Sequence, residues 1–86
     1  MATAKTEVID IPMYKHAESS RATLVSLDNN PAHATWSHKS RSVFVAYKGT
    51  PHHGELAIVI WYALQKGFIS EEDYKTENFK LAIPRR

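Results

Sequence analysis

The most constraining feature of the chain is an unbroken run of nine apolar or aromatic residues at positions 56–64. Helix signals flank this run, because Thr50 is a favourable N-cap, Pro51 suits the first helical position, and Gly67 suits the left-handed position after a helix. The run is about half as long as a membrane-spanning helix. The pattern therefore predicts one long apolar helix over residues 51–66, about 24 Å in length.

The predicted helix is apolar around its whole circumference, whereas an ordinary surface helix has a single apolar stripe. The stripe expected to pack on a sheet consists of Leu56, Val59, Ile60, Ala63 and Gly67. The opposite side carries Ile58, Trp61, Tyr62 and Gln65. Since Trp and Tyr are enriched at binding hot spots, we predict that this second side is an interface with another chain, centred on Trp61.

Two other interpretations of the run are open. The second side of the helix could be covered by the N-terminal strand or by a second helix of the same chain. Alternatively, the apolar run itself could form a strand, because the Ile, Val, Trp and Tyr residues at positions 58–62 have high β-propensity. The signals at Thr50 and Gly67 favour the helical interpretation.

The remaining segments either alternate between apolar and polar residues or carry turn signals. Strands are predicted over residues 7–13, 22–27, 32–38, 41–48 and 79–83, with a polar connection over 15–20. Residues 41–48 are apolar on both faces, which predicts the central strand, and Pro12 predicts an edge position for 7–13. A capping box of Ser70 and Asp73 predicts a short second helix.

These elements predict an α+β fold in a single domain, 1–86, with flexible ends at 1–6 and 85–86. The fold would consist of a small, mostly antiparallel sheet of four to five strands, the long apolar helix packed on it, and the short helix. For a chain of 86 residues, burial contributes roughly 135 kcal/mol and ordering costs roughly 130 kcal/mol. A lone copy is therefore expected to be marginally stable, which favours a homodimer.

Positive charge is concentrated in the middle of the chain, although the formal net charge is only +2. No acidic residue lies between Asp28 and Glu55. The predicted basic surface of this region consists of Trp36, His38, Lys39, Arg41 and Lys48. Such a surface would steer an acidic protein partner, or it would bind nucleic acid with Trp36 stacking on a base. An ordinary solvated surface would have the same composition.

No motif in the chain indicates an enzyme, a cofactor site or a disulfide framework. The chain has no cysteine, no nucleophile elbow around a serine, and too few glycines for a phosphate-binding loop. His52 and His53 are adjacent and would point in different directions on a helix, so a metal site would also need His33 and His38. We therefore predict a non-enzymatic protein without a metal ion or cofactor.

A binding role is the function class that is left. Small chains without motifs are typical of accessory proteins of phages and mobile elements, and this analogy of size suggests an inhibitor or regulator that occupies the surface of a host protein. Residues 1–6 lack the apolar core of a secretory signal, so a cytoplasmic location is expected. A nucleic-acid-binding protein with a basic surface is the alternative function.

Overall fold

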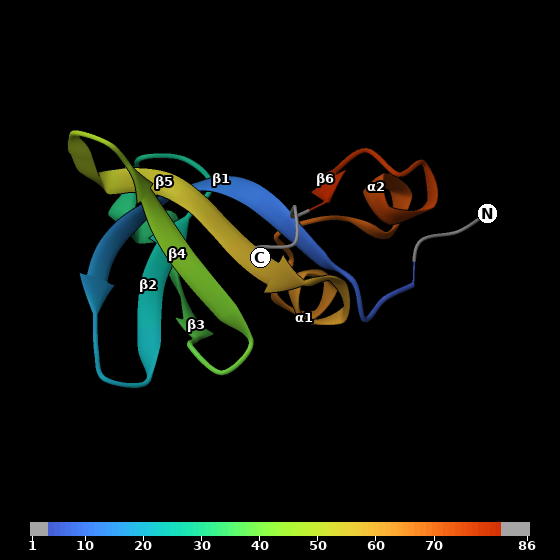
Figure 1. Ribbon diagram of the computed structural model, residues 1–86, viewed down its shortest axis with the longest axis horizontal. Helices are drawn as coiled ribbons and strands as arrows, with labels where there is room; N and C mark the ends of the chain where they lie inside the picture. The colour runs from blue at the N-terminus through green and yellow to red at the C-terminus, as the bar shows by residue number, and fades with distance from the viewer. Residues whose placement is uncertain (1–3, 82–86) are drawn as a thin grey trace.

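The computed structural model describes residues 4–81, and this part of the chain is mostly strand (Figure 1). The strands are β1 (Val8–Glu18), β2 (Ala22–Ser26), β3 (Thr35–His38), β4 (Ser42–Tyr47), β5 (Thr50–Val59) and β6 (Lys80–Leu81). The helices are α1 (Ile60–Lys66), α2 (Glu71–Lys75) and a single 3₁₀ turn, Pro31–His33. The predicted α+β fold, with one long helix packed on a small sheet, is therefore wrong.

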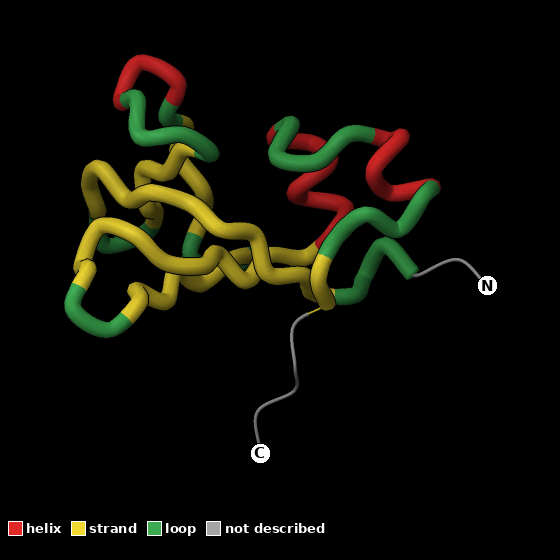
Figure 2. Tube along the Cα trace, turned by 90° about the horizontal axis from the view of Figure 1, so that it is seen from above, coloured by secondary structure: helices red, strands yellow, loops and turns green. Residues whose placement is uncertain are grey.

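All paired strands are antiparallel, in the order β3-β2-β1-β5-β4, and β6 pairs with the beginning of β1. The outermost strands, β3 and β4, are joined by the short segment 39–41, so the sheet curls until its two edges approach each other. The hydroxyl groups of Ser37 on β3 and Ser42 on β4 lie 2.5 Å apart and connect these edges. The result is a partly open barrel, with both α-helices gathered at one end (Figure 1 and Figure 2).

Residues 50–59, predicted to be the first part of the long helix, form strand β5. The side chains of β5 alternate, so that Leu56 and Ile58 are fully buried whereas Ala57 and Val59 are half-buried on the other face. β-Branched residues favour a strand, and β1 and β4 pair with the two edges of β5. The interpretation of the apolar run as a strand is thus correct as far as Val59.

The helix signal at Thr50 belongs instead to a β-hairpin. Tyr47 on β4 pairs with Thr50 on β5, so Lys48 and Gly49 form a two-residue turn. Gly49 has a φ of +82°. Tight hairpin turns need a positive φ of this kind, and glycine adopts it readily. The hydroxyl group of Thr50 donates to the carbonyl oxygen of Tyr47 at 3.1 Å rather than capping a helix.

Helix α1 begins at Ile60 because the N-terminal segment of the chain caps it. The backbone N–H of Ile60 donates to the carbonyl oxygen of Glu7 at 2.9 Å. The N–H of Trp61 donates to the carbonyl oxygen of Lys5 at 3.0 Å. The first N–H groups of a helix need acceptors outside it, and here a segment distant in sequence supplies them. At the other end Gly67 has a φ of +79°, which confirms the predicted left-handed glycine after the helix.

The predicted central strand lies at the edge of the sheet, and the predicted edge strand lies in its middle. Strand β4, predicted to be central, is the outermost strand, and β1, predicted at an edge, lies in the middle. β1 also continues to Glu18, through the segment predicted as a polar connection. Pro12 fits within β1 because one side of the strand is unpaired there, between Asp10, which pairs with β6, and Tyr14, which pairs with β2.

The second predicted helix signal is confirmed in α2. The side chain of Ser70 accepts a hydrogen bond from the N–H of Asp73 at 3.0 Å, and the Asp73 carboxylate accepts one from the N–H of Ser70 at 3.4 Å. Residues 1–3 and 82–86 lie outside the described residues. They include most of the predicted flexible ends and the last part of the strand predicted over 79–83.

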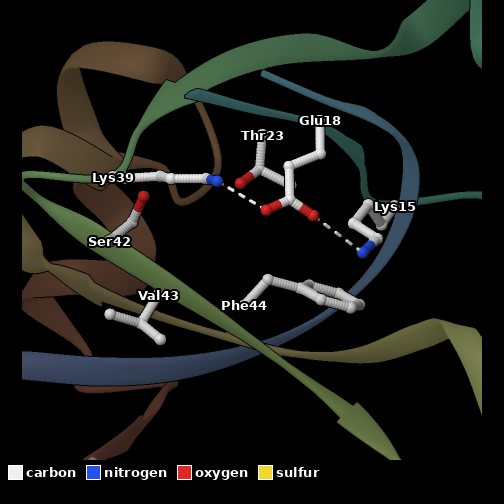
Figure 3. A pocket seen from close by; sticks show the side chains of 7 residues that line it. All are labelled: Lys15, Glu18, Thr23, Lys39, Ser42, Val43 and Phe44. Atoms are coloured by element: carbon white, nitrogen blue, oxygen red, sulfur yellow. Dashed lines mark hydrogen bonds and ion pairs between the residues drawn. The ribbon is translucent and has the colours of Figure 1, made fainter. Parts of the chain in front are cut away.

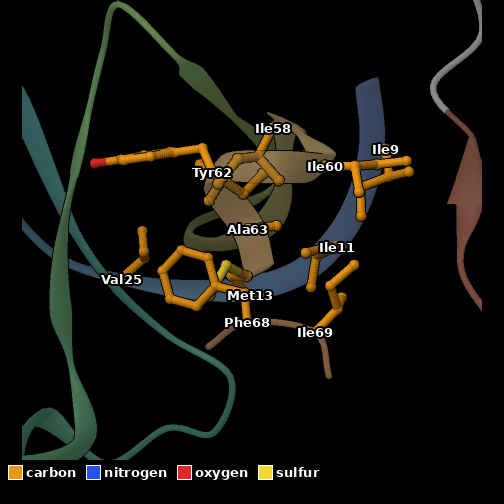
Figure 4. Close-up of a cluster of buried hydrophobic side chains, with 11 residues drawn as sticks. Ile9, Ile11, Met13, Val25, Ile58, Ile60, Tyr62, Ala63, Phe68 and Ile69 are labelled. Carbon is orange, nitrogen blue, oxygen red and sulfur yellow. The ribbon is translucent and has the colours of Figure 1, made fainter. Parts of the chain in front are cut away.

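The core lies inside the barrel and between the sheet and the helices (Figure 4). Its side chains are Ile9, Ile11, Met13, Val25, Leu56, Ile58, Ile60, Tyr62, Ala63, Phe68 and Ile69. These residues come from the inner faces of β1, β2 and β5, from α1, and from the connection that follows α1. The outer face of β1, β5 and β4 is different, because Val8, Val43 and Val45 are exposed there.

Candidate binding surface

The outer face of β4, β5 and β1 carries a shallow groove with a volume of about 480 Å³. Its principal residues are Val8, Val43, Ala57, Val59 and Trp61, with Lys39 and Arg41 at one end. We call this surface the basic–apolar groove. No carboxylate is among the described residues that line it.

Strand register brings the apolar part of the groove together. Val43 on β4 is opposite Ala57 on β5, and Val59 on β5 is opposite Val8 on β1. Side chains alternate along a strand, so these four residues share the outer face while Ile58 points into the core. Val43 is 59% exposed, which is a large fraction for a valine in a sheet that has its core on the other face.

Trp61 lies at the end of the groove because α1 follows directly on β5. Its side chain is 39% exposed. The ring is edge-on to that of Tyr62, with the ring centres 5.7 Å apart, and the Arg41 guanidinium lies 5.5 Å from the centre of the indole ring. This cation–π contact holds a positive charge next to an exposed aromatic surface.

Tyr62 connects the groove to the core. Its side chain is only 3% exposed, and its hydroxyl group accepts a hydrogen bond from the N–H of His38 at 3.1 Å. The guanidinium of Arg41 and the ammonium of Lys66 lie 5.7 Å and 5.5 Å from the centre of the Tyr62 ring. These contacts fix the turn between β3 and β4, and with it Arg41, against helix α1.

Of the four residues predicted as an interface, two are exposed and two are buried. Ile58 has no exposed surface and Tyr62 almost none, because both belong to the core of a single chain (Figure 4). Trp61 and Gln65 are exposed on α1. Within this predicted set, Trp61 is therefore the aromatic residue that a partner can reach.

The predicted basic surface is divided by the sheet. His38, Lys39 and Arg41 lie together at the turn between β3 and β4. Trp36 is 44% exposed and shares the outer face of β3 with His38. Lys48 lies in the turn at the other end of β4, so the whole length of that strand separates it from Arg41.

The sequence patterns do not identify the valines of the groove. They place Val43 in a buried central strand and Val59 on the sheet-facing side of the long helix. The dipeptide of Lys48 and Gly49 is the signal that could have found them. As a hairpin turn it pairs 42–47 with 50–59, and this pairing places both valines on one face.

A second and smaller cavity, of about 210 Å³, lies between β1, β2 and β4 (Figure 3). We call it the Glu18 pocket, because the Glu18 carboxylate is held there between two ammonium groups. Lys39 Nζ lies 2.5 Å from one carboxylate oxygen, and Lys15 Nζ lies 3.1 Å from the other. The hydrogen bond from Lys39, and then that from Lys15, lowers the pKa of Glu18 below its ordinary value of 4.5.

The histidines do not converge on one site. A ring nitrogen of His33 lies 2.8 Å from the Asp28 carboxylate. His53 stacks on Tyr14 with the ring centres 4.4 Å apart, and His52 precedes it on a strand, so the two point to opposite faces. Among residues 4–81, no group of three or more His, Asp or Glu side chains is placed to hold a metal ion.

Comparison of the chain with protein-family models, with curated proteins and with solved structures found no match. No helix in the part of the chain that the structure describes has the length and apolar character needed to cross a membrane. The function therefore has to be inferred from the surface of the molecule itself.

Proposed function

We propose that this chain is a non-enzymatic cytoplasmic protein that regulates or inhibits another protein by binding to an acidic region of its surface. The observation that supports this proposal is the basic–apolar groove. There an exposed sheet face and an exposed tryptophan form one apolar surface, and two cations border it.

Burial of the apolar part of the groove would provide the driving force for binding. Burial of exposed apolar surface is favourable by about 25 cal/mol per Å². Val43 and Trp61 are large, exposed and fixed by the strand and helix on which they lie, so little conformational entropy is lost when a partner covers them. Contiguous exposed apolar surface of this kind is typical of protein-interaction sites.

The cations at the end of the groove indicate the chemistry of the partner. Lys39 and Arg41 line the groove, and no described acidic residue lines it with them. The ammonium of Lys39 is paired with Glu18, so Arg41 contributes the positive charge that no described carboxylate neutralises. A partner with carboxylates beside an apolar patch would match this distribution of charge, and the attraction would raise the rate of association.

The edge of the sheet offers a second mode of contact. Strand β4 is the outermost strand, and beyond Ser42, where its edge meets β3, no described strand pairs with that edge. An exposed edge of this kind can pair with an extended segment of a partner, and side chains on alternate positions then give specificity. Val43 and Val45 are exposed on this strand and would meet such a segment.

A second copy of the chain is a poorer match to the groove than an acidic partner. In a symmetric dimer the same surface meets itself, so Lys39 and Arg41 of one copy would approach those of the other. Repulsion between like charges opposes that arrangement. Light scattering tests this directly: a dimer that Trp61→Ala converts to a monomer would identify a second copy as the occupant and overturn the proposal.

The main test compares two tryptophan variants. A bound protein is isolated with the wild-type chain, purified, and titrated by calorimetry against the wild type, Trp61→Ala and the control Trp36→Ala. Loss of a hot-spot side chain costs about 2 kcal/mol or more, so Trp61→Ala should weaken binding at least tenfold. Trp36→Ala should bind within twofold of the wild type. Equal affinities for the two variants, with circular dichroism showing both folded, would refute the proposal.

The alternative, nucleic-acid binding through Trp36, Lys39, Arg41 and Lys48, is decided with the same variants. These residues do not form one continuous track, because Lys48 lies at the opposite end of β4 from Arg41. Binding to DNA or RNA that weakens steeply as salt rises, and that Trp36→Ala abolishes but Trp61→Ala does not, would overturn the protein-binding proposal.

A further inference from the structure

The Glu18 pocket contains a hydroxyl group that the fold leaves without a partner. Thr23 on β2 is only 5% exposed, and its hydroxyl group makes no hydrogen bond with any described residue. Among the described residues, no fully enclosed side-chain oxygen or nitrogen lacks a partner, so the small exposed part of Thr23 includes its hydroxyl oxygen. Figure 3 shows that this oxygen points toward the space beside Glu18 and Lys39. Because this oxygen is accessible from the pocket, it can form a hydrogen bond with a group that is bound there.

Hydrogen-bond donors exceed acceptors in this pocket. Each lysine ammonium has three N–H donors, and the Glu18 carboxylate accepts one hydrogen bond from Lys15 and one from Lys39. Donors on both ammonium groups are therefore left for a further acceptor, together with the hydroxyl group of Thr23. The ring of Phe44 provides an apolar wall (Figure 3).

We propose that the Glu18 pocket binds a carboxylate of an acidic side chain on the partner protein. The acidic side chain would accept hydrogen bonds from Lys15, Lys39 and Thr23, and its methylene groups would contact Phe44. This inference rests on the proposed function, because it identifies the part of the molecule that recognises the acidic partner.

The net charge of the pocket suits a single carboxylate. Two ammonium groups and one carboxylate leave a single positive charge. One further carboxylate neutralises this charge, and a titration with phosphate tests the competing anion. Glu18 itself shows that the spacing of the two ammonium groups suits a carboxylate, since one oxygen faces each of them (Figure 3).

The position of the pocket favours a protein side chain over a free small molecule. Lys39, Ser42 and Val43 line both the Glu18 pocket and the basic–apolar groove, so the two cavities adjoin at the start of β4. A polypeptide that covers the Lys39 end of the groove therefore lies next to the pocket. The volume of about 210 Å³ also suits one side chain better than a larger ligand.

The test uses the isolated chain, so it does not depend on a natural partner. Amide chemical shifts are followed by NMR during titration with hexaglutamate, hexaglutamine, acetate and inorganic phosphate at constant ionic strength. Hexaglutamate should shift the amides of Glu18, Thr23 and Lys39, and it should bind at least tenfold more tightly than acetate or phosphate. Hexaglutamine should produce no saturable shift.

Two variants distinguish a specific pocket from general attraction between charges. Thr23→Val keeps the shape and charge of the chain, so hexaglutamate should bind it three- to tenfold more weakly, while the control Thr35→Val on β3 leaves the affinity unchanged. Glu18→Gln removes the competing carboxylate and should strengthen binding at least threefold. Glu71→Gln makes the same change of charge on α2 and should have less than half that effect.

Several results would overturn the inference. Tighter binding of phosphate than of hexaglutamate would assign the pocket to phosphate, and equal binding of acetate would assign it to small free carboxylates. Equal effects of Glu18→Gln and Glu71→Gln would show that only overall charge matters. None of these outcomes involves Trp61, so they would refute the pocket without refuting the proposed function, which the tryptophan variants test separately.

Discussion

Replacement of Gly54 by alanine is expected to disrupt the pairing of β4 with β5. Gly54 lies in the middle strand of three, opposite Met13 on β1 and Ala46 on β4. A methyl group on its Cα atom would lie 2.1 Å from the carbonyl oxygen of Val45 and 2.6 Å from the Cα atom of Ala46. Both contacts are with backbone atoms, so rotation of a side chain cannot relieve them.

The size of the effect follows from this geometry. Because Cβ atoms essentially never approach other atoms closer than 3.0 Å, β4 would have to move away from β5 by about 1 Å near Val45. Overpacking costs about 1–3 kcal/mol, and each backbone hydrogen bond weakened by the movement adds about 1 kcal/mol. We therefore expect Gly54→Ala to lower the free energy of unfolding by about 3 kcal/mol, or the melting temperature by roughly 15 °C.

Urea unfolding followed by tryptophan fluorescence measures this loss, and Gly49→Ala is the matched control. A methyl group on Gly49 would have no atom within 4 Å, but the residue has a φ of +82°. Alanine at this position should lower the free energy of unfolding only by the strain of the left-handed conformation, which is about 1 kcal/mol. Hydrogen exchange should also become faster along β4 in Gly54→Ala only. If Gly54→Ala lost no more stability than Gly49→Ala, the close approach of β4 to β5 would be refuted.

Three other changes have defined outcomes. Tyr62→Phe removes the hydroxyl group that accepts a hydrogen bond from the backbone N–H of His38 at 3.1 Å. Urea unfolding should show a free energy of unfolding lower by about 1 kcal/mol. An unchanged value would contradict this hydrogen bond between α1 and the β3–β4 turn. Ser70→Ala removes the N-cap of α2 and should cost about 1 kcal/mol by the same measurement, whereas Thr76→Ala should cost less. The folded-state pKa of Glu18 is lowered, so its stabilising contribution is present above pH 4.5 and is lost as the pH falls through the lowered pKa. Acid titration of stability should therefore show a steeper loss in the wild type than in Glu18→Gln, and identical profiles would refute the ion pairs.

The sequence predicts those parts of the fold that depend on neighbouring residues. The capping box of Ser70 and Asp73 and the left-handed Gly67 are local signals, and each lies where it was expected. The start of the long helix was wrong because its true cap comes from elsewhere. The carbonyl oxygens of Lys5 and Glu7 satisfy the first N–H groups of α1, so no capping residue is needed beside the helix.

Some residues of the candidate site were predictable from the sequence, but its geometry was not. Charge and composition single out Lys39, Arg41 and Trp61, and all three line the same groove. Their proximity depends on a long-range arrangement, since α1 must follow β5 and the β3–β4 turn must close on it through Tyr62. Thr23 carries no sequence signal, because only the structure shows that its hydroxyl group faces the Glu18 pocket without a partner.

The wrong prediction for β4 itself supports the proposed function. A strand that is apolar on both faces is normally buried on both faces, which is why 41–48 was expected at the centre of the sheet. In the structure Phe44 faces the inner side, while Val43 and Val45 face outward from the edge strand. Local sequence and global position disagree here, and such disagreements occur mainly at functional sites. A partner that covers the outer face of β4 would remove the disagreement, because the strand would then be buried on both faces, as its composition predicts.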